Sequence, residues 1–378
     1  PKTRLVLVGD HVTALPEESF QKCKVDFVLT GGDYDFLLIN VLSNLKNGEK
    51  LEPGIWYRDG RQIKNTGPFV CDHDLRALPW IDRDLTCWRL YSEKNGNYRR
   101  IPGTYIMSGR DCWHGKCTFC SWTTIYPTYR TRDPIDVVDE IGDLIERYGV
   151  LEIMDDTGTF PVGEWLKKFC QAMIERGYNK KVYIDCNMRF GRLTFDDYKL
   201  MKEAGFRFVL FGLESANQAT LDRLVKGIKV EDITEGAKVA SRAGLDVHVT
   251  VMFGYPWEGS EEMERTVQLA RNLLVKGFAY TLQVTLVIPY PGTPLFKECE
   301  EQNILSTRNW DDFDMRMNVM KGKASEQDIK EAIRKVYRGF FHPLAIWNRI
   351  ANTRHPVDDI KFYARGLHSV LGHLRDFR

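Results

Sequence analysis

Short apolar runs alternate with amphipathic stretches over more than half of the chain. Six of these runs have the length and composition of strands: Thr104–Ser108, Val150–Asp155, Val182–Cys186, Arg207–Gly212, Asp246–Phe253 and Tyr280–Ile288. Between them, apolar residues recur at the spacing of one helix face. Six consecutive strand–helix units predict a parallel sheet that curls into a barrel, complete or partial.

The signals for the ends of the helices agree with this pattern. Asp133 is a predicted N-cap with Pro134 in the first turn. The next apolar residues share one helix face: Ile135, Val138, Ile141, Leu144 and Ile145. A second helix is predicted from Gly163 to Arg176, where Gly177 provides a stop.

The first 50 residues predict a smaller α/β layer. Strand-like runs at Arg4–Val8 and Val25–Thr30 alternate with helical segments at Pro16–Lys22 and Tyr34–Leu45. Two strands alone make a sheet too small to bury both faces. We therefore expect the sequence to begin partway through a flavodoxin-like domain.

The remaining stretches differ in character. Residues 51–96 contain a predicted hairpin turn at Asp59-Gly60, and we interpret this stretch as a linker. Residues 303–378 contain helical patterns at Glu326–Phe341 and Asp358–Asp376. We predict four parts: residues 1–50 as part of an α/β domain, 51–96 as a linker, 97–302 as the barrel, and 303–378 as a helical C-terminal segment.

Composition excludes some classes of protein. The net charge of +1 gives no indication of a nucleic-acid partner. No apolar run is long enough to span a bilayer and no signal peptide is recognisable. Six of the nine cysteines are scattered, as expected of reduced thiols in a cytoplasmic protein. The predicted C-terminal helices are basic and amphipathic. One interpretation is peripheral contact with a membrane surface. The other is that their apolar faces pack on the barrel.

The remaining three cysteines lie together just after the first barrel strand. Cys112, Cys117 and Cys120 form a C-x4-C-x2-C pattern in the stretch YIMSGRDCWHGKCTFCSW. Three thiolates suit a four-iron cluster that keeps one iron open, because a structural metal site usually has four ligands. The alternative is a zinc knuckle in which His114 is the fourth ligand, although His114 follows Cys112 too closely to orient easily.

This stretch resembles the cluster loop of the radical S-adenosylmethionine (SAM) superfamily, although the first gap is one residue longer than usual. The resemblance implies that Cys112, Cys117 and Cys120 hold a [4Fe-4S] cluster whose open iron binds SAM. It also implies a partial (β/α)6 TIM-like barrel and chemistry by a 5'-deoxyadenosyl radical. The cofactors would supply the reactivity, and the protein would orient them.

Polar residues follow several of the predicted strands, where functional groups of barrels lie. By resemblance, Glu214 in FGLES lies near the SAM ribose, and Gly254 and the backbone at Phe119 lie near adenine. Asp155 and Asp156 occupy the place of a Gly-Gly-Glu stretch that contacts the SAM amino group, a departure from the family pattern. The predicted SAM-binding residues are therefore Phe119, Asp155, Asp156, Asn187, Arg189, Glu214 and Gly254.

The N-terminal stretches VGDHVTALPEE and VDFVLTGGDYDF resemble the second half of the cobalamin-binding domain that precedes one large radical SAM subgroup. Ligands of open α/β sheets gather at the carboxyl ends of the strands. The predicted cobalamin-binding residues there are Gly9, His11, Thr13, Gly31 and Gly32. The alternative is that these glycines only close tight turns.

Together these features predict a radical SAM enzyme that uses a [4Fe-4S] cluster, SAM and cobalamin. The chain resembles uncharacterised and hopanoid-pathway members of the subgroup. C–H functionalisation by methyl transfer is the first interpretation, and a radical rearrangement or ring contraction in lipid or natural-product biosynthesis is the second. A non-catalytic metal-binding or electron-transfer module is the alternative of another class.

The partners of such an enzyme would be a small-molecule or lipid substrate and an external electron donor such as flavodoxin or ferredoxin. The side chains that could line the substrate side are Tyr126, Tyr129, Arg130, Arg189, Tyr255 and Trp257.

Overall fold

The computed structural model describes residues 3–95, 97–351, 358–366 and 372. The chain divides into two compact units. The smaller unit comprises residues 1–77, 110–130 and 289–304, and the larger unit comprises residues 78–109, 131–288 and 305–378. The predicted boundaries at residues 50, 96 and 302 stay a prediction.

The smaller unit contains a four-stranded sheet. Its strands, in spatial order, are β1 (Val6–Leu7), β2 (Phe27–Leu29), β3 (Ile55–Asp59) and β4 (Gln62–Asn65). The pair β1–β2 is parallel, and β3 and β4 are antiparallel to their neighbours. The hairpin at Asp59-Gly60 is confirmed, but the expected two-strand sheet is wrong because β3 pairs with β2. The hairpin thus supplies the backbone partners that β2 would otherwise lack.

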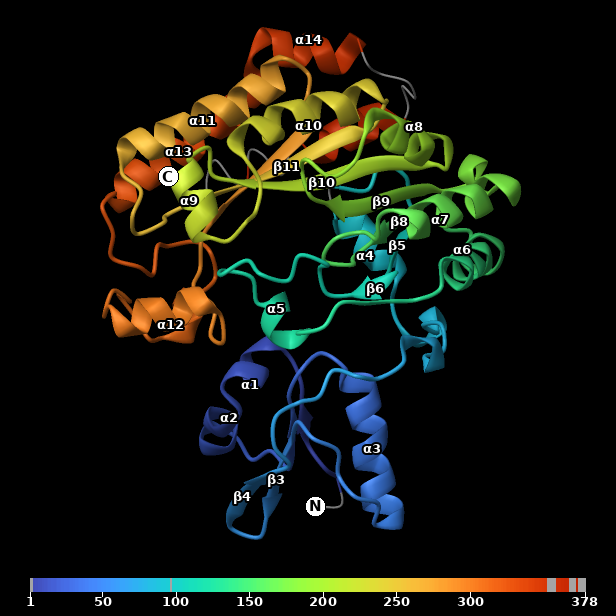
Figure 1. Cartoon of the computed structure of the whole chain (residues 1–378), viewed down its shortest axis with the longest axis vertical. Coiled ribbons are helices and arrows are strands. Elements are labelled where there is room, and N and C mark those ends of the chain that lie inside the picture. Colours follow the sequence, from blue (N-terminus) through green and yellow to red (C-terminus); the bar gives the residue numbers. More distant parts are fainter. Residues whose placement is uncertain (1–2, 96, 352–357, 367–371, 373–378) are drawn as a thin grey trace. The chain divides into compact units, whose positions relative to one another are not determined.

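Helices cover both faces of this small sheet (Figure 1). Phe27 and Leu29 of β2 pack against α3 (Tyr34–Asn47), and Val28 points to the opposite face with Phe20 of α2 (Pro16–Lys22). This alternation is that of a strand buried on both sides. The other helices of the smaller unit are α1 (Asp10–Ala14), α5 (Trp122–Ile125) and α12 (Pro294–Glu301).

The larger unit contains a six-stranded parallel sheet in chain order. Its strands are β5 (Gly103–Ile106), β8 (Glu152–Asp155), β9 (Tyr183–Met188), β10 (Phe206–Glu214), β11 (Asp246–Phe253) and β12 (Thr281–Leu286). All six predicted strands are confirmed. Among the described residues β5 and β12 do not pair with each other, so the barrel is partial. The short strands β6 (Gly109–Arg110) and β7 (Arg130–Thr131) pair separately.

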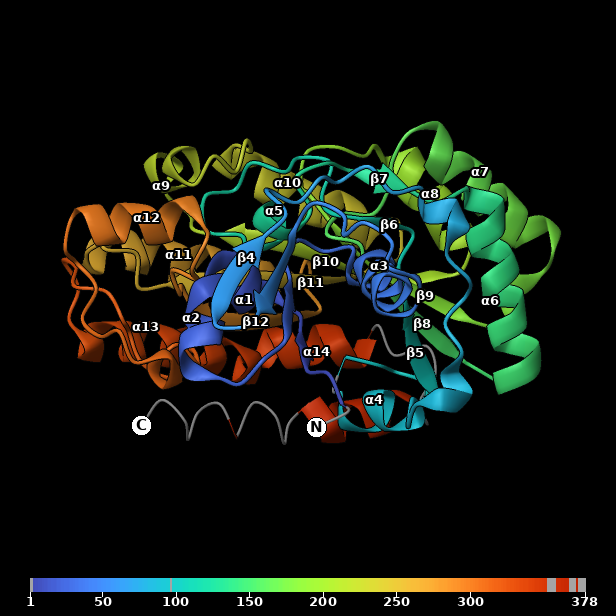
Figure 2. The same cartoon turned by 90° about the horizontal axis from the view of Figure 1, so that it is seen from below.

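Amphipathic helices connect the strands along the outer face of the sheet. Figure 2 shows α6, α7 and α8 on one side of it. As predicted, the Asp133 side chain caps the first helix by accepting from the Ile135 N–H at 2.8 Å. The side chain of Ile135 is exposed, however, and Val137 is buried in its place. The connecting helices are α6 (Pro134–Tyr148), α7 (Glu164–Glu175), α8 (Phe195–Glu203), α9 (Gln218–Arg223), α10 (Val230–Arg242) and α11 (Ser260–Val275).

The C-terminal helices belong to the larger unit. The predicted helix at Glu326–Phe341 forms α13 (Glu326–Arg338) and a following turn, and its apolar face is buried against α11 and β12. Of the two alternatives for this tail, membrane contact or packing on the barrel, α13 therefore follows the second. Residues 358–366 are helical as predicted, and the rest of the helix predicted to Asp376 lies outside the described residues apart from position 372. The remaining helices are α4 (Arg89–Lys94) and α14 (Pro343–Ala351). No helix among the described residues has the length and apolarity to cross a membrane.

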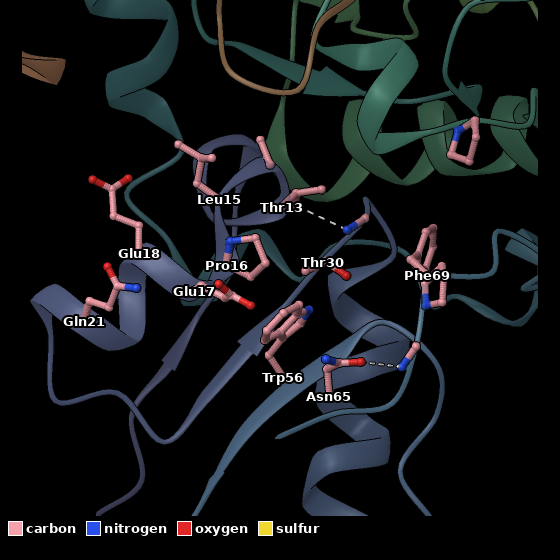
Figure 3. Close-up of a pocket in the computed structure, with 15 residues that line it drawn as sticks. Thr13, Leu15, Pro16, Glu17, Glu18, Gln21, Thr30, Trp56, Asn65 and Phe69 are labelled. Carbon is pink, nitrogen blue, oxygen red and sulfur yellow. Dashed lines mark hydrogen bonds between the residues drawn. The ribbon is translucent and has the colours of Figure 1, made fainter. Parts of the chain in front are cut away.

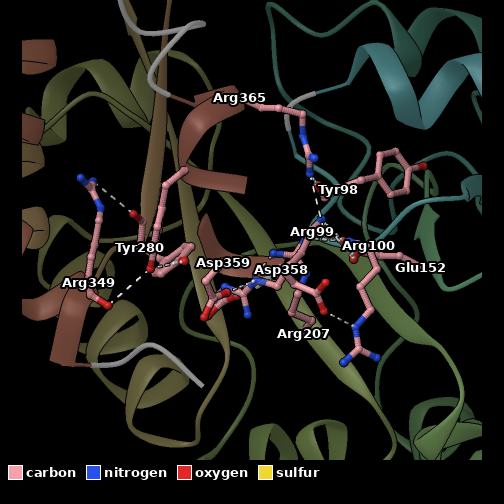
Figure 4. Close-up of polar contacts among 12 residues, drawn as sticks. Tyr98, Arg99, Arg100, Glu152, Arg207, Tyr280, Arg349, Asp358, Asp359 and Arg365 are labelled. Carbon is pink, nitrogen blue, oxygen red and sulfur yellow. Dashed lines mark hydrogen bonds and ion pairs between the residues drawn. The ribbon is translucent and has the colours of Figure 1, made fainter. Parts of the chain in front are cut away.

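A network of charged residues lies at the amino ends of the larger unit's strands (Figure 4). Arg207, which is fully buried, contacts Glu152 and Asp185, each at 2.7 Å. Arg99 pairs with Asp246 at 2.9 Å and with Asp359 at 3.0 Å. The strand ends opposite this network carry the predicted SAM residues other than Phe119.

Candidate functional site

The cysteine segment, residues 110–130, lies in the smaller unit. Cys112, Cys117 and Cys120 are half-buried and none forms a disulfide. A turn holds the last two together, because the Cys120 N–H donates to the Cys117 carbonyl at 3.2 Å. Phe119, half-buried, precedes the last thiol.

The three thiols are a donor set that fits an iron–sulfur cluster. Within the described part of the chain, no three His, Cys, Asp or Glu side chains converge as ligands of one metal ion would. Three thiolates can each bind a different iron of a four-iron cluster, which leaves one iron open.

At the end of β8, Asp155 is fully buried and already engaged. Its Oδ2 accepts from the Ser108 N–H at 2.9 Å and from the Ser108 hydroxyl at 2.5 Å, and its Oδ1 accepts from the Thr157 N–H at 3.0 Å. Burial raises the pKa of Asp155, although these hydrogen bonds oppose the shift. Asp155 thus connects the ends of β5 and β8 and has no exposed surface for a ligand.

The next residue, Asp156, has different surroundings. It is half-buried, and burial together with the charge of Asp155 raises the pKa of Asp156 to about 6, although a hydrogen bond from Asn187 lowers it. Asn187 at the end of β9 also donates to the Thr157 carbonyl at 3.1 Å. The structure therefore brings Asp156 and Asn187 together at neighbouring strand ends, both partly open to solvent.

Glu214 ends β10 in a left-handed backbone conformation, with φ at 61°. Its Oε1 accepts from the Lys226 Nζ at 2.6 Å, and both side chains are buried. A Cβ at Gly212 would lie 2.1 Å from this carboxylate, so the glycine provides the space for it. Arg189 of the third strand end is buried and donates to the Lys226 carbonyl. Glu214, Lys226 and Arg189 thus form one buried group.

Glu258 follows β11, and the structure gives it a clear position. It is buried, and its Oε1 accepts from Ser215 and Thr220 hydroxyls at 2.6 Å and from the Asn217 amide at 3.1 Å. Burial raises the pKa of Glu258, and these hydrogen bonds oppose the shift. Glu258 therefore joins the loops after β10 and β11. Nearby, Gly254 has a φ of 94°, a conformation that favours glycine.

The smaller unit contains a pocket of about 810 Å³ at the carboxyl ends of β1 and β2. Figure 3 shows Thr13, Thr30 and Trp56 around it. Of the residues predicted to bind cobalamin, Thr13 and Gly31 line the pocket, and the Gly31 N–H donates to the Thr13 hydroxyl at 3.2 Å. The other three are not part of its lining: Gly9, His11 and Gly32.

Residues 106–270 match the model of the Radical SAM superfamily. The chain therefore contains a Radical SAM domain. Enzymes of the superfamily use a [4Fe-4S] cluster and SAM, act on small-molecule substrates and need a reductant. The family predicted from the cysteine pattern and from FGLES is therefore confirmed.

Several relatives match most of the length of this chain. An uncharacterized methyltransferase from Pyrococcus horikoshii is 28% identical over 359 residues, which is 89% of this chain and 72% of the relative. The anaerobic magnesium-protoporphyrin IX monomethyl ester cyclase of Cereibacter sphaeroides is 26% identical over 363 residues, 92% of this chain and 56% of the relative. A hopanoid C-3 methylase from Methylococcus capsulatus is 23% identical over 221 residues, 58% of this chain and 40% of the relative.

Among solved structures, the cobalamin-dependent SAM radical enzyme OxsB, with aqua-cobalamin and SAM bound, has a TM-score of 0.71. The match is 14% identical and covers 97% of this chain and 58% of OxsB, so it describes the fold alone. The radical SAM chain thus spans little more than half the length of OxsB and of the cyclase.

Proposed function

We propose that the chain is a cobalamin-dependent radical SAM enzyme that transfers a methyl group to a carbon of a small-molecule or lipid substrate. In this proposal Cys112, Cys117 and Cys120 bind three irons of a [4Fe-4S] cluster. SAM binds at the strand ends of the larger unit, and cobalamin binds in the pocket of the smaller unit. The proposed SAM contacts in the larger unit are Asp156, Asn187, Arg189, Glu214 and Gly254, and the contact predicted for Phe119 of the smaller unit stays a prediction.

One observation carries the cobalamin part of the proposal. Within the smaller unit, the cysteine segment contributes Pro127 to the lining of the pocket, beside Thr13, Thr30 and Gly31. The pocket lies at the carboxyl ends of two parallel strands, where ligands of such sheets bind. Its volume is within the range of roughly 300–1,000 Å³ typical of small-molecule sites. A corrinoid there would lie against the segment that carries the three thiols.

The residues of the larger unit would hold SAM through complementary charge. When bound, a reduced cluster would supply the electron that breaks a C–S bond of SAM. The carboxylate of Asp156 would accept hydrogen bonds from the SAM ammonium group, with Asn187 beside it. The buried Glu214–Lys226 pair would offer hydrogen-bonding groups to the ribose. Asp155 would act through Ser108 and Thr157, whose backbone it holds.

A second candidate reaction is ring cyclisation without methyl transfer. Three relatives have this printed activity and match 92%, 90% and 57% of the chain, and the first two cover as much of it as the methyltransferase from Pyrococcus horikoshii does. Product analysis distinguishes the two reactions. Methyl transfer would release S-adenosylhomocysteine together with 5'-deoxyadenosine, whereas cyclisation would release 5'-deoxyadenosine alone.

The proposal includes an external electron donor such as flavodoxin or ferredoxin, and peripheral membrane contact if the substrate is a lipid. The apolar face of α14 favours this contact, because Trp347 and Ile350 are 65% and 61% exposed. Sedimentation with anionic phospholipid vesicles would test it. The double variant Trp347→Ser, Ile350→Ser should bind less, and equal binding of the variant and the wild type would contradict the contact.

The first experiment uses anaerobically reconstituted protein. We expect iron and sulfide for one [4Fe-4S] cluster, an EPR signal of the reduced cluster that shifts when SAM is added, and loss of the cluster in Cys117→Ala. Bound zinc, or a cluster signal that ignores SAM, would instead support a metal-binding or electron-transfer module.

Cobalamin binding is tested separately, by the change in absorption of hydroxocobalamin. Asn65→Trp places a large side chain at the pocket lining and should weaken binding. Lys64→Trp is the matched control, because Lys64 is the neighbouring exposed residue of β4 and does not line the pocket. Equal binding by both variants would contradict a corrinoid in this pocket.

A further inference from the structure

The cysteine segment begins and ends with arginines that bind the same carboxylate. Arg110 Nη1 donates to Asp33 Oδ1 at 2.6 Å. Arg130 donates through Nη1 to Asp33 Oδ2 and through Nη2 to Asp33 Oδ1, both at 2.8 Å. The Asp33 side chain has no exposed surface. One buried side chain therefore connects the two ends of the segment that carries the three cysteines.

The surroundings of Asp33 keep it ionised and fixed. His73 Nδ1 lies 2.8 Å from Asp33 Oδ2, while His73 Nε2 lies 3.0 Å from Glu52, and the imidazole stacks on Phe36 at 4.4 Å between ring centroids. Burial raises the pKa of Asp33, but hydrogen bonds from Arg130, Arg110 and His73 lower it to below its ordinary value. Charge-assisted hydrogen bonds of this kind are stronger than neutral ones.

Asp33 also belongs to the loop that borders the pocket. Thr30 and Gly31, which precede it in the chain, line the pocket. Gly32 packs so closely on the cysteine segment that a Cβ there would lie 1.9 Å from the Tyr126 ring. The loop after β2 thus contacts the cysteine segment at two points, through Asp33 at the arginines and through Gly32 at Tyr126.

We infer that Asp33 is a positioning residue for the cysteine segment, holding both of its ends against the loop that borders the pocket. This inference rests on the proposed function, in which the segment binds a [4Fe-4S] cluster. Asp33 does not contact the cluster. It acts through Arg110 and Arg130, and so sets the position of the cysteines relative to the pocket within the smaller unit.

The test compares Asp33→Asn with Asp35→Asn. Asparagine keeps the size of Asp33 but removes its charge, so one of its terminal atoms cannot accept from an arginine. Asp35 is the matched control because it is two residues away, is 39% exposed in its side chain and pairs with Arg110 alone of the two arginines. Hydrogen exchange of peptides covering residues 110–130 is measured without iron. The EPR spectrum, midpoint potential and rate of cluster loss to a chelator are measured after reconstitution.

We expect Asp33→Asn to exchange faster over residues 110–130, to lose its cluster about 10-fold faster and to shift the EPR spectrum and potential of the cluster that it retains. Asp35→Asn should change less than Asp33→Asn in all four measurements, because Asp33 still holds both arginines. A wild-type spectrum, potential and loss rate in fully loaded Asp33→Asn would overturn the inference, and so would equal effects of the two variants.

If Asp33→Asn does not fold, Arg130→Gln replaces it, because this change releases one end of the segment and leaves Asp33 paired with Arg110. Faster exchange near residue 130 together with faster cluster loss would support the inference, and wild-type behaviour would overturn it. If the wild-type chain assembles no cluster, the proposed function fails, while the exchange experiment still decides whether Asp33 holds the segment.

Discussion

At the scale of single residues, two adjacent carboxyl groups at the end of β8 have different surroundings. Asp155 is buried with three donors, whereas Asp156 is partly open beside Asn187. We expect Asp155→Asn to lower the free energy of unfolding by about 1–3 kcal/mol, because the new amide nitrogen faces buried donors. Asp156→Asn should leave stability within about 0.5 kcal/mol of wild type. Urea unfolding of the iron-free variants measures both changes.

SAM affinity should fall more in Asp156→Asn than in Asp155→Asn, which is the reverse of the order expected for stability. It should also depend on pH. The pKa of Asp156 is raised to about 6, so its carboxylate gains charge as the pH rises through that value. SAM binding to the reconstituted enzyme should therefore strengthen between pH 5 and about pH 7 through the ammonium contact. Asp156→Asn should bind more weakly and lose this pH dependence. An unchanged pH profile in the variant would contradict the proposed contact.

His248 of β11 makes a second prediction about pH. Burial, with the nearby charge of Arg207, lowers the pKa of His248 to about 3, and its Nε2 has no hydrogen-bond partner within the described structure. The unfolded chain takes up a proton near its ordinary pKa, whereas the folded chain does not. Stability is therefore lost as the pH falls below the unfolded value, by about 2 kcal/mol between pH 7.5 and pH 5.

The substitution His248→Asn removes the titrating group and can keep the hydrogen bond that His248 Nδ1 makes with Thr281 at 2.8 Å. We expect the variant to lose about 2 kcal/mol less than wild type over this pH interval. Urea unfolding of iron-free protein at both pH values measures the difference. Parallel pH dependences of the two proteins would mean that His248 is not the responsible group.

Site residues could be predicted where they lie close together in the sequence, and not where they lie far apart. Cys112, Cys117 and Cys120 lie within nine residues, so their spacing alone indicates shared chemistry. Asp33 and Arg130 are 97 residues apart, and no periodic pattern connects them. Asp155 and Asp156 are equivalent in sequence, and only the packing of Ser108 against one of them distinguishes their roles. Burial and long-range pairing thus limited the sequence prediction.

At the scale of elements, α13 protects the edge of the larger unit's sheet. The buried Tyr337 hydroxyl of α13 accepts from the Val284 N–H of β12, the last strand, at 3.2 Å. Tyr337→Phe leaves this edge donor buried without a partner, so we expect the free energy of unfolding to fall by about 1–3 kcal/mol.

Tyr198→Phe is the control. Its hydroxyl is buried and, among the residues described, has no partner, so its removal should cost little. Equal effects in denaturant melts would contradict this role of Tyr337.

Elements were predictable where apolar periodicity was strong and local. Strand β11 has the predicted bounds, Asp246–Phe253, because a mostly buried apolar run is flanked by turns. The prediction of a two-strand sheet at the N-terminus was wrong because pairing between β2 and β3 is a tertiary event. The hairpin itself could be predicted from Asp59-Gly60, but its partner strand could not.

At the scale of the whole chain, residues distant in sequence meet at the amino ends of the larger unit's strands. Asp359 pairs with Arg99, and Arg365 donates to the Tyr98 carbonyl at 2.7 Å. Arg99 lies 5.3 Å from the Tyr280 ring centroid. A C-terminal helical stretch thus connects the chain before β5 with the start of β12. Because active sites of barrels lie at the carboxyl ends, this network is expected to serve stability.

The substitution Asp359→Asn tests that separation of roles. Asp359 is 1% exposed, and removing one partner of a buried ion pair costs about 3–5 kcal/mol. We expect the melting temperature of the larger unit to fall by about 6–15 °C in calorimetry. The SAM affinity of the folded variant should stay at the wild-type value, because SAM is proposed to bind at the opposite strand ends. Asp314→Asn, which breaks an exposed pair with Arg316, is the control and should melt near wild type. Loss of SAM affinity in folded Asp359→Asn would instead mean that the amino-end network supports the site as well as the fold.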